Sequence, residues 1–206
     1  MGSGIAARCL VNAAGVYHSF QPRPSENRIL RFSSPLMYLL RDREFVSPTL
    51  EGKLDTRARA VYDLAAGRVL ASVDLPSSRE KVFPALTGPE VKTWWTNPGV
   101  FDTREWSADV RVGGSWRGSG VARDGPWLLE GQFREVDAYT KLVFTWRSVG
   151  GVDQDSVVTY LLEPVAGGTR LVLRHEGFVG APIACVRSSA GWEACFEALG
   201  KLLSRG

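Results

Sequence analysis

The last stretch of the sequence, a strand pattern followed by a helical pattern, most constrains what this chain can fold into. Leu171, Leu173 and His175 alternate along residues 171–178, so in a strand they point to one face. A turn signal follows at residues 180–182, and apolar residues then recur at helical spacing. These helical positions are Trp192, Cys195, Phe196, Leu199, Leu202 and Leu203. The combination predicts a sheet with one buried face, wrapped around a long C-terminal helix over about 184–204.

The region before this stretch predicts an antiparallel meander. Alternating, β-rich segments are separated by short Gly, Asp and Pro turn signals, a pattern typical of strands joined by tight turns. The predicted strands are 68–75, 100–106, 115–121, 127–136, 141–149, 156–164 and 169–178. Residues 54–64 are ambiguous between strand and helix.

Two short helices are predicted between the first two of these strands. Ser78 is a candidate N-cap, and Val82, Phe83 and Leu86 form the apolar face of the first helix. Pro89 is the predicted first residue of the second helix. The order of elements therefore predicts an α+β fold, with helices packed on one face of a curved antiparallel sheet.

The first quarter of the chain has a different pattern from the rest. Four prolines interrupt residues 1–50, and no helical or strand period persists there. We interpret 1–50 as a poorly ordered N-terminal extension and 51–206 as one folded domain. Two alternatives remain for the extension: translation starting at Met37, or a tail that docks on a partner.

Charge and composition exclude several function classes. The net charge of +3 lies in residues 1–50, with six arginines against three acidic residues, so 51–206 is neutral. Nucleic-acid binding therefore lacks its usual electrostatic support. Two histidines and three cysteines without a Cys-x-x-Cys pair predict neither a metal site nor a disulfide framework, and we predict no cofactor.

The sequence also bears on location and assembly. No run approaches the roughly 20 apolar residues of a membrane helix, so no membrane insertion is predicted. The first 20 residues do not form a convincing signal peptide, and a cytoplasmic location is the simplest interpretation. For the oligomeric state we expect a monomer or a homodimer.

An ordered set of motifs along the domain resembles a known family. The motifs are Leu86-Thr-Gly-Pro-Glu90, Trp94-Trp95, Trp106, Val112-Gly-Gly-Ser-Trp116, Glu130-Gly131, Glu135-Val-Asp137, Leu142-Val-Phe-Thr-Trp146, Leu162-Glu-Pro164, Gly167-Gly-Thr-Arg-Leu171, His175-Glu-Gly-Phe178 and Gly191-Trp192. In order and spacing the set resembles the SRPBCC (START-like) superfamily over residues 68–204. Within it, the chain is most similar to the branch that includes the C-terminal domain of the heat-shock protein 90 ATPase activator.

The resemblance implies a helix-grip fold with an apolar cavity between the sheet and the C-terminal helix. Members bind lipids, polyketides or other small hydrophobic molecules, and some are enzymes, so the resemblance implies no single reaction. Eukaryotic chaperone activators carry a separate N-terminal domain that makes much of the chaperone contact. Residues 1–50 are too short to be that domain, and we treat the resemblance as one of fold.

Aromatic residues and one histidine are the candidate ligand-binding residues. They are Trp94, Trp116, Phe133, Phe144, Trp146, His175, Trp192 and Phe196. Core packing and a ligand-binding wall are both open for the tryptophans, because large aromatics fill cores and also line pockets. For His175 the alternatives are a hydrogen-bonded core residue, and a polar anchor or proton-transfer group. Glu130 is its candidate acid partner, but strand parity places Glu130 on the opposite face.

Three functions follow as hypotheses. The first is binding of a small hydrophobic molecule in the cavity, without chemistry. The second is a cyclase- or hydrolase-type enzyme that uses the same cavity. The third is an interaction module similar to the chaperone ATPase activator. The volume, openness and polar lining of the cavity discriminate among them.

Overall fold

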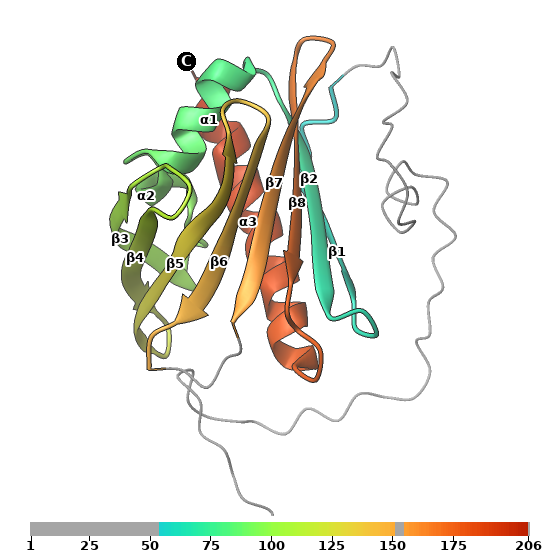
Figure 1. The fold of residues 1–206 in the computed structure, drawn as a ribbon. Helices are drawn as coiled ribbons and strands as arrows, with labels where there is room; N and C mark the ends of the chain where they lie inside the picture. The colour runs from blue at the N-terminus through green and yellow to red at the C-terminus, as the bar shows by residue number, and fades with distance from the viewer. Residues whose placement is uncertain (1–53, 151–154, 206) are drawn as a thin grey trace, which may run out of the picture. The chain divides into compact units, whose positions relative to one another are not determined.

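The computed structural model describes residues 54–150 and 155–205, which include eight strands and three helices (Figure 1). In chain order the elements are β1 (Arg59–Asp63), β2 (Arg68–Leu75), α1 (Arg79–Thr87), α2 (Val91–Trp94), β3 (Phe101–Ala108), β4 (Ser115–Ala122), β5 (Gly125–Asp137), β6 (Lys141–Ser148), β7 (Ser156–Val165), β8 (Gly168–Glu176) and α3 (Pro182–Leu203). The predicted extension, residues 1–50, lies outside the described residues.

The strands form one antiparallel sheet in the order β1-β2-β8-β7-β6-β5-β4-β3. From β3 to β8 each strand pairs with the next along the chain, which is the meander that the sequence predicts. The exception is β2, which pairs with β8 and so places the first two strands beside the last one. The predicted α+β helix-grip arrangement is therefore correct.

Two of the predicted local elements differ in the structure, and a third lacks an expected hydrogen bond. The ambiguous segment contains a strand, β1, because its backbone pairs with β2 from Arg59 to Asp63. The second short helix begins at Val91 and not at Pro89. Pro89 lies in a tight turn, in which its carbonyl accepts a hydrogen bond from the Lys92 N–H. Ser78 is the N-cap of α1, but its hydroxyl makes no capping hydrogen bond.

The three helices supply the other layer of the core. In Figure 1, α3 runs behind the sheet, and α1 and α2 lie beside its C-terminal half. α3 buries the stripe predicted from its spacing, with Trp192, Phe196 and Leu199 at most 5% exposed. α1 buries Val82 and Leu86. Apolar burial of this kind, at about 25 cal/mol per Å² removed from water, is the main stabilising contribution to the fold.

The edge strand β1 is held by the side chains of α3. Glu197 accepts a hydrogen bond from the backbone N–H of Ala58 at 2.9 Å, and Glu193 accepts one from Ala60 at 3.2 Å. The two glutamates are one helical turn apart, and the two amides are two residues apart along an extended backbone. Two backbone donors at this end of the sheet are therefore satisfied within the chain rather than left for another strand.

Among residues 54–150 and 155–205, no helix has the length and apolar character needed to cross a membrane.

Candidate functional site

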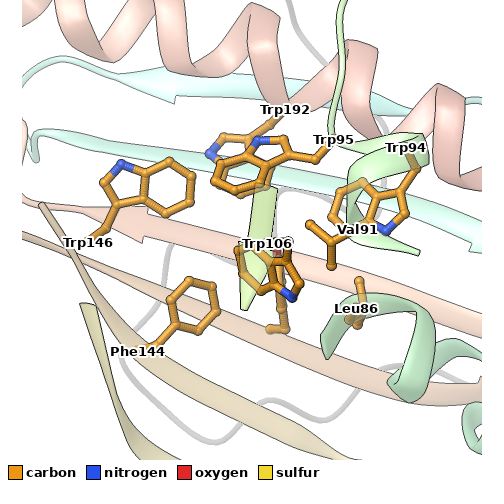
Figure 2. A pocket seen from close by; sticks show the side chains of 9 residues that line it. Leu86, Val91, Trp94, Trp95, Trp106, Phe144, Trp146 and Trp192 are labelled. Carbon is orange, nitrogen blue, oxygen red and sulfur yellow. The ribbon is translucent and has the colours of Figure 1, made fainter. Parts of the chain in front are cut away.

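A small cavity lies between the sheet and the helices, with walls that are almost entirely aromatic and aliphatic (Figure 2). Its lining residues come from both layers of the fold: the helices α1 and α3 with the α2 segment, and the strands β3, β6 and β7. They are Leu86, Val91, Trp94, Trp95, Trp106, Phe144, Trp146, Tyr160 and Trp192. Among these residues only Trp106 and Trp146 are half-buried, and the others are buried. The wall therefore meets solvent on the side of these two tryptophans.

Trp95 occupies the centre of the aromatic packing. Its ring contacts four other indoles, with centroid distances of 5.0–6.2 Å. The four are Trp106, Trp116, Trp127 and Trp146. Gly118 on β4 makes room for it, because a Cβ at this glycine would lie 2.9 Å from the Trp95 ring. This buried glycine on β4 thus accommodates a tryptophan ring.

Several indoles are fixed by hydrogen bonds to backbone carbonyls. Trp94 donates to Ala85 at 2.8 Å, and Trp106 donates to Thr87 at 3.0 Å, so both tie the cavity wall to the C-terminal half of α1. A buried donor left without its acceptor costs about 1–3 kcal/mol, which opposes rotation of these rings. Trp95 and Trp146 differ, because neither indole N–H has an acceptor among the described residues.

His175 lies behind the wall in a fully satisfied hydrogen-bond chain. The indole N–H of Trp192 donates to His175 Nδ1 at 3.1 Å, so Nδ1 is unprotonated. His175 Nε2–H then donates to Ser156 Oγ at 2.9 Å, and the Ser156 hydroxyl donates to the Trp146 carbonyl at 3.2 Å. This chain joins α3 to strands β6, β7 and β8 and fixes the neutral tautomer of the imidazole.

The surroundings of His175 oppose its protonation. The side chain is 2% exposed and packs against the rings of Trp146, Phe178 and Trp192. Burial lowers the pKa of His175 from 6.5 to about 3, because the imidazolium would lose its hydration without gaining a carboxylate partner. A proton-transfer role at neutral pH would require His175 to break its bond to Trp192 first.

Two further titratable groups near the cavity are also held neutral. Burial raises the pKa of the Tyr160 hydroxyl well above its usual value, so the phenol stays protonated. Burial likewise raises the pKa of the Cys195 thiol, so it is not a thiolate nucleophile at neutral pH. Cys185 is also buried, as expected for a small apolar core group.

The cavity is small in this structure. The space open to the centre of a water-sized sphere measures about 20 Å³. On this measure one water molecule needs about 10–15 Å³, so the cavity has room for about one water. A larger guest would enter only after wall side chains move, and Trp95 is one of the lining rings with no side-chain hydrogen bond to break.

Four of the eight predicted site residues line this cavity: Trp94, Phe144, Trp146 and Trp192. The other four lie one layer behind it, each in ring contact with a lining residue. Trp116 packs on Trp106, Phe133 on Phe144, His175 on Trp146, and Phe196 on Tyr160. Their role in ligand binding stays a prediction. Glu130, the candidate acid partner of His175, pairs with Arg147 instead.

Five lining residues are absent from the predicted set: Leu86, Val91, Trp95, Trp106 and Tyr160. Strand parity contains a signal for Tyr160, because Ser156, Val158 and Tyr160 alternate on β7 and all three are buried. The tandem Trp94-Trp95 contains another signal, since both rings reach the wall from the end of α2. The sequence predicts Leu86 on an apolar helix face, and in the structure Leu86 reaches the cavity.

Comparison with known proteins agrees with the fold. A family model described as "Activator of Hsp90 ATPase homolog 1-like protein" matches residues 76–204, which is more than half of the chain. This segment runs from the end of β2 to the end of α3 and contains every lining residue of the cavity. No curated protein matches the chain.

Solved bacterial structures share the same fold. A protein from Rhodobacter sphaeroides is 21% identical with a TM-score of 0.63, and the match covers 73% of this chain and 100% of that one. A protein from Chromobacterium violaceum is 22% identical with a TM-score of 0.61, covering 66% and 96%. A protein from Mesorhizobium loti is 26% identical with a TM-score of 0.56, covering 67% and 97%.

Proposed function

The chain belongs to the Activator of Hsp90 ATPase homolog 1-like family, and from this premise we propose that its START-like domain binds a small apolar molecule between the sheet and α3. The observation that carries the proposal is the composition of the cavity wall. All nine lining residues are aliphatic or aromatic, and none is charged. Small-molecule sites are typically apolar and aromatic, with few polar groups.

Uptake requires the cavity to open, and Trp95 is the side chain on which we expect opening to depend. It follows the four-residue helix α2, so little regular structure holds it. Its indole N–H has no acceptor to lose, whereas Trp94, Trp106 and Trp192 each donate a hydrogen bond. An engineered apolar cavity of about 150 Å³ binds benzene. Displacement of one large ring must therefore open a cavity of about this volume before a guest of that size can bind.

The experiment is a binding titration on the full chain with a naphthalene-based hydrophobic dye, followed by dye fluorescence. Trp95→Ala should bind the dye at least tenfold more tightly than the wild type, because the cavity then exists before binding. Tyr62→Ala is the matched control, since it removes a half-exposed aromatic ring from the edge strand β1. If neither the wild type nor Trp95→Ala binds the dye, the cavity is a packed core and the proposal fails.

The enzymatic alternative has less support from the geometry. His175 does not line the cavity, and both of its ring nitrogens are hydrogen-bonded within the fold. Its lowered pKa further disfavours an acid or base role near neutral pH. His175 is better explained as the residue that positions Trp192 and Trp146. The cytoplasmic location and the chaperone-related interaction role stay predictions.

A further inference from the structure

Six of the seven tryptophans form one connected network of indole rings, in which the centroids of contacting rings lie 5.0–6.2 Å apart. They are Trp95, Trp106, Trp116, Trp127, Trp146 and Trp192. Trp192 joins the network through Trp146, its one indole contact among the described residues, at 5.4 Å. Indole is the most easily oxidised aromatic side chain that stays protonated, and rings in contact exchange an electron rapidly. The network can therefore move an oxidising equivalent through the core.

The buried end of the network cannot retain a positive charge. Removal of one electron from Trp192, which is 5% exposed, leaves a radical cation, and burial disfavours the charged form of a group. Loss of the indole proton would neutralise the ring, but the acceptor of that proton is His175 Nδ1, and Nε2 of the same imidazole is already protonated. Burial lowers the pKa of His175 to about 3, so this imidazole is a poor acceptor for the proton. The charge therefore leaves Trp192 by electron transfer from a neighbouring ring.

Trp146 is the neighbour that can supply the electron. Tyr160 also contacts Trp192, at 6.0 Å, but a phenol gives up an electron readily only when its proton leaves too. Burial raises the pKa of the Tyr160 hydroxyl well above its usual value, so this proton stays in place. Trp146 is half-buried, and its indole N–H has no acceptor among the described residues, so water can take its proton. In Trp106, the other half-buried ring of the cavity wall, the N–H donates to a backbone carbonyl, which cannot accept the proton.

We propose that the indole network carries an oxidising equivalent from its buried end at Trp192 to Trp146, so that a one-electron oxidation of the core ends as a repairable radical at the surface. An oxidising radical or ultraviolet light first removes one electron from Trp192. The Trp192 radical cation then takes one electron from Trp146 and becomes a neutral indole again. The N–H proton of Trp146 passes to water and leaves a neutral ring radical. A soluble one-electron reductant, a thiol or ascorbate, returns the electron, and water returns the proton. This transfer needs no guest in the cavity.

The test starts the reaction inside the full chain with light. Intense ultraviolet pulses eject electrons from exposed and buried indoles alike, and mass spectrometry of peptides then measures the oxidised product at each tryptophan. In the wild type, oxidation at Trp192 should be low and oxidation at Trp146 high. Trp146→Phe keeps an aromatic ring but cannot carry the charge, because a benzene ring is much harder to oxidise than an indole. In this variant, oxidation at Trp192 should rise several-fold relative to Trp94.

Trp106→Phe is the matched control, because this ring is also half-buried and in the network but does not contact Trp192. It should leave oxidation at Trp192 as low as in the wild type. Trp94 is 2% exposed and lies outside these ring contacts, so its oxidation reports any general loosening of the core and should be equal in all three proteins. Ascorbate should lower oxidation at Trp146 in the wild type and leave oxidation at Trp192 in Trp146→Phe unchanged.

Three outcomes would overturn the proposal, and the first needs no variant. Trp192 could already be as oxidised as Trp94 in the wild type, which would mean that no charge leaves it. Oxidation at Trp192 could stay low in Trp146→Phe, which would mean that Trp146 is not the exit. Oxidation at Trp94 could rise in step with Trp192, which would mean that Trp146 only shields the core.

Discussion

Lowering the pH should destabilise the domain through one buried side chain, His175. The folded state keeps its imidazole neutral, with a pKa of about 3, whereas the same side chain in the unfolded chain has a pKa of about 6.5. Below pH 6.5 the unfolded state therefore takes up a proton that the folded state does not. The contribution of His175 to stability is fully present above pH 6.5 and is lost as the pH falls towards 3.

The magnitude follows from the two pKa values. Each pH unit in this window removes about 1.4 kcal/mol, so the loss is about 2 kcal/mol at pH 5 and about 3 kcal/mol at pH 4. Among residues 54–150 and 155–205, no charged side chain faces His175 to offset the cost. Its neighbours across the sheet are Val69 and Val158, and its ring contacts are Trp146, Phe178 and Trp192.

The assay is urea unfolding of the full chain at pH 7, 6, 5 and 4, followed by tryptophan fluorescence. His175→Gln is the matched control, because glutamine can accept from Trp192 and donate to Ser156 but does not titrate. Carboxylates protonate in the same window in both proteins, so the difference in unfolding free energy isolates the histidine. The wild type should lose about 2 kcal/mol more than the variant between pH 7 and pH 5.

Parallel pH profiles for the two proteins would refute this reasoning. They would mean that His175 gains its proton in the folded state, and hence that its bond to Trp192 is not maintained. A nitrogen NMR spectrum of the imidazole gives a second readout. At pH 7 it should show a protonated Nε2 and an unprotonated Nδ1, as the hydrogen-bond chain requires.

Two other predictions concern features of the fold around the site. The double variant Glu193→Ala, Glu197→Ala should lose about 1–3 kcal/mol of unfolding free energy in urea and should self-associate in size-exclusion chromatography, because two amides of the β1 edge lose their acceptors. A double glutamine variant, which keeps the acceptor oxygens, should stay close to the wild type. Equal behaviour of the two variants would contradict the edge role. Gly118→Ala should lower the free energy of unfolding by about 1–3 kcal/mol, since the new methyl group would lie 2.9 Å from Trp95. Combining it with Trp95→Ala should recover part of this loss. Strict additivity of the two changes would show that the two positions do not contact each other.

Much of the fold could be predicted because its signals are local. The alternation of Leu171, Leu173 and His175 gives the buried face of β8, and all three side chains are at most 2% exposed. Turn residues separate the meander strands because tight connections need their backbone freedom, as at Gly113 with a φ of 79°. The pattern over β1 is ambiguous, because five residues with two exposed apolar side chains give neither a clean alternation nor a helical stripe.

The candidate site was only half predictable, because its geometry depends on contacts between distant residues. Periodicity places Trp192 and His175 on buried faces, but the bond between them depends on where α3 crosses β8. Likewise, sequence spacing cannot show that Gly118 accommodates Trp95, or that the enclosed space is small. Tyr160 is absent from the predicted site residues although its strand parity is regular, because parity shows that a side chain is buried but not that it borders the cavity.

The pairing of β2 with β8 has a consequence for how the chain is made. Residues 68–75 leave the ribosome long before their partners at 169–176, and the helix that covers the sheet is synthesised later still. Local hairpins from β3 to β8 can form during synthesis, but the apolar face they share stays uncovered until α3 emerges. Nascent chains that stop before residue 182 should therefore be protease-sensitive and in need of chaperone protection, and resistance should appear only once Leu203 has left the exit tunnel.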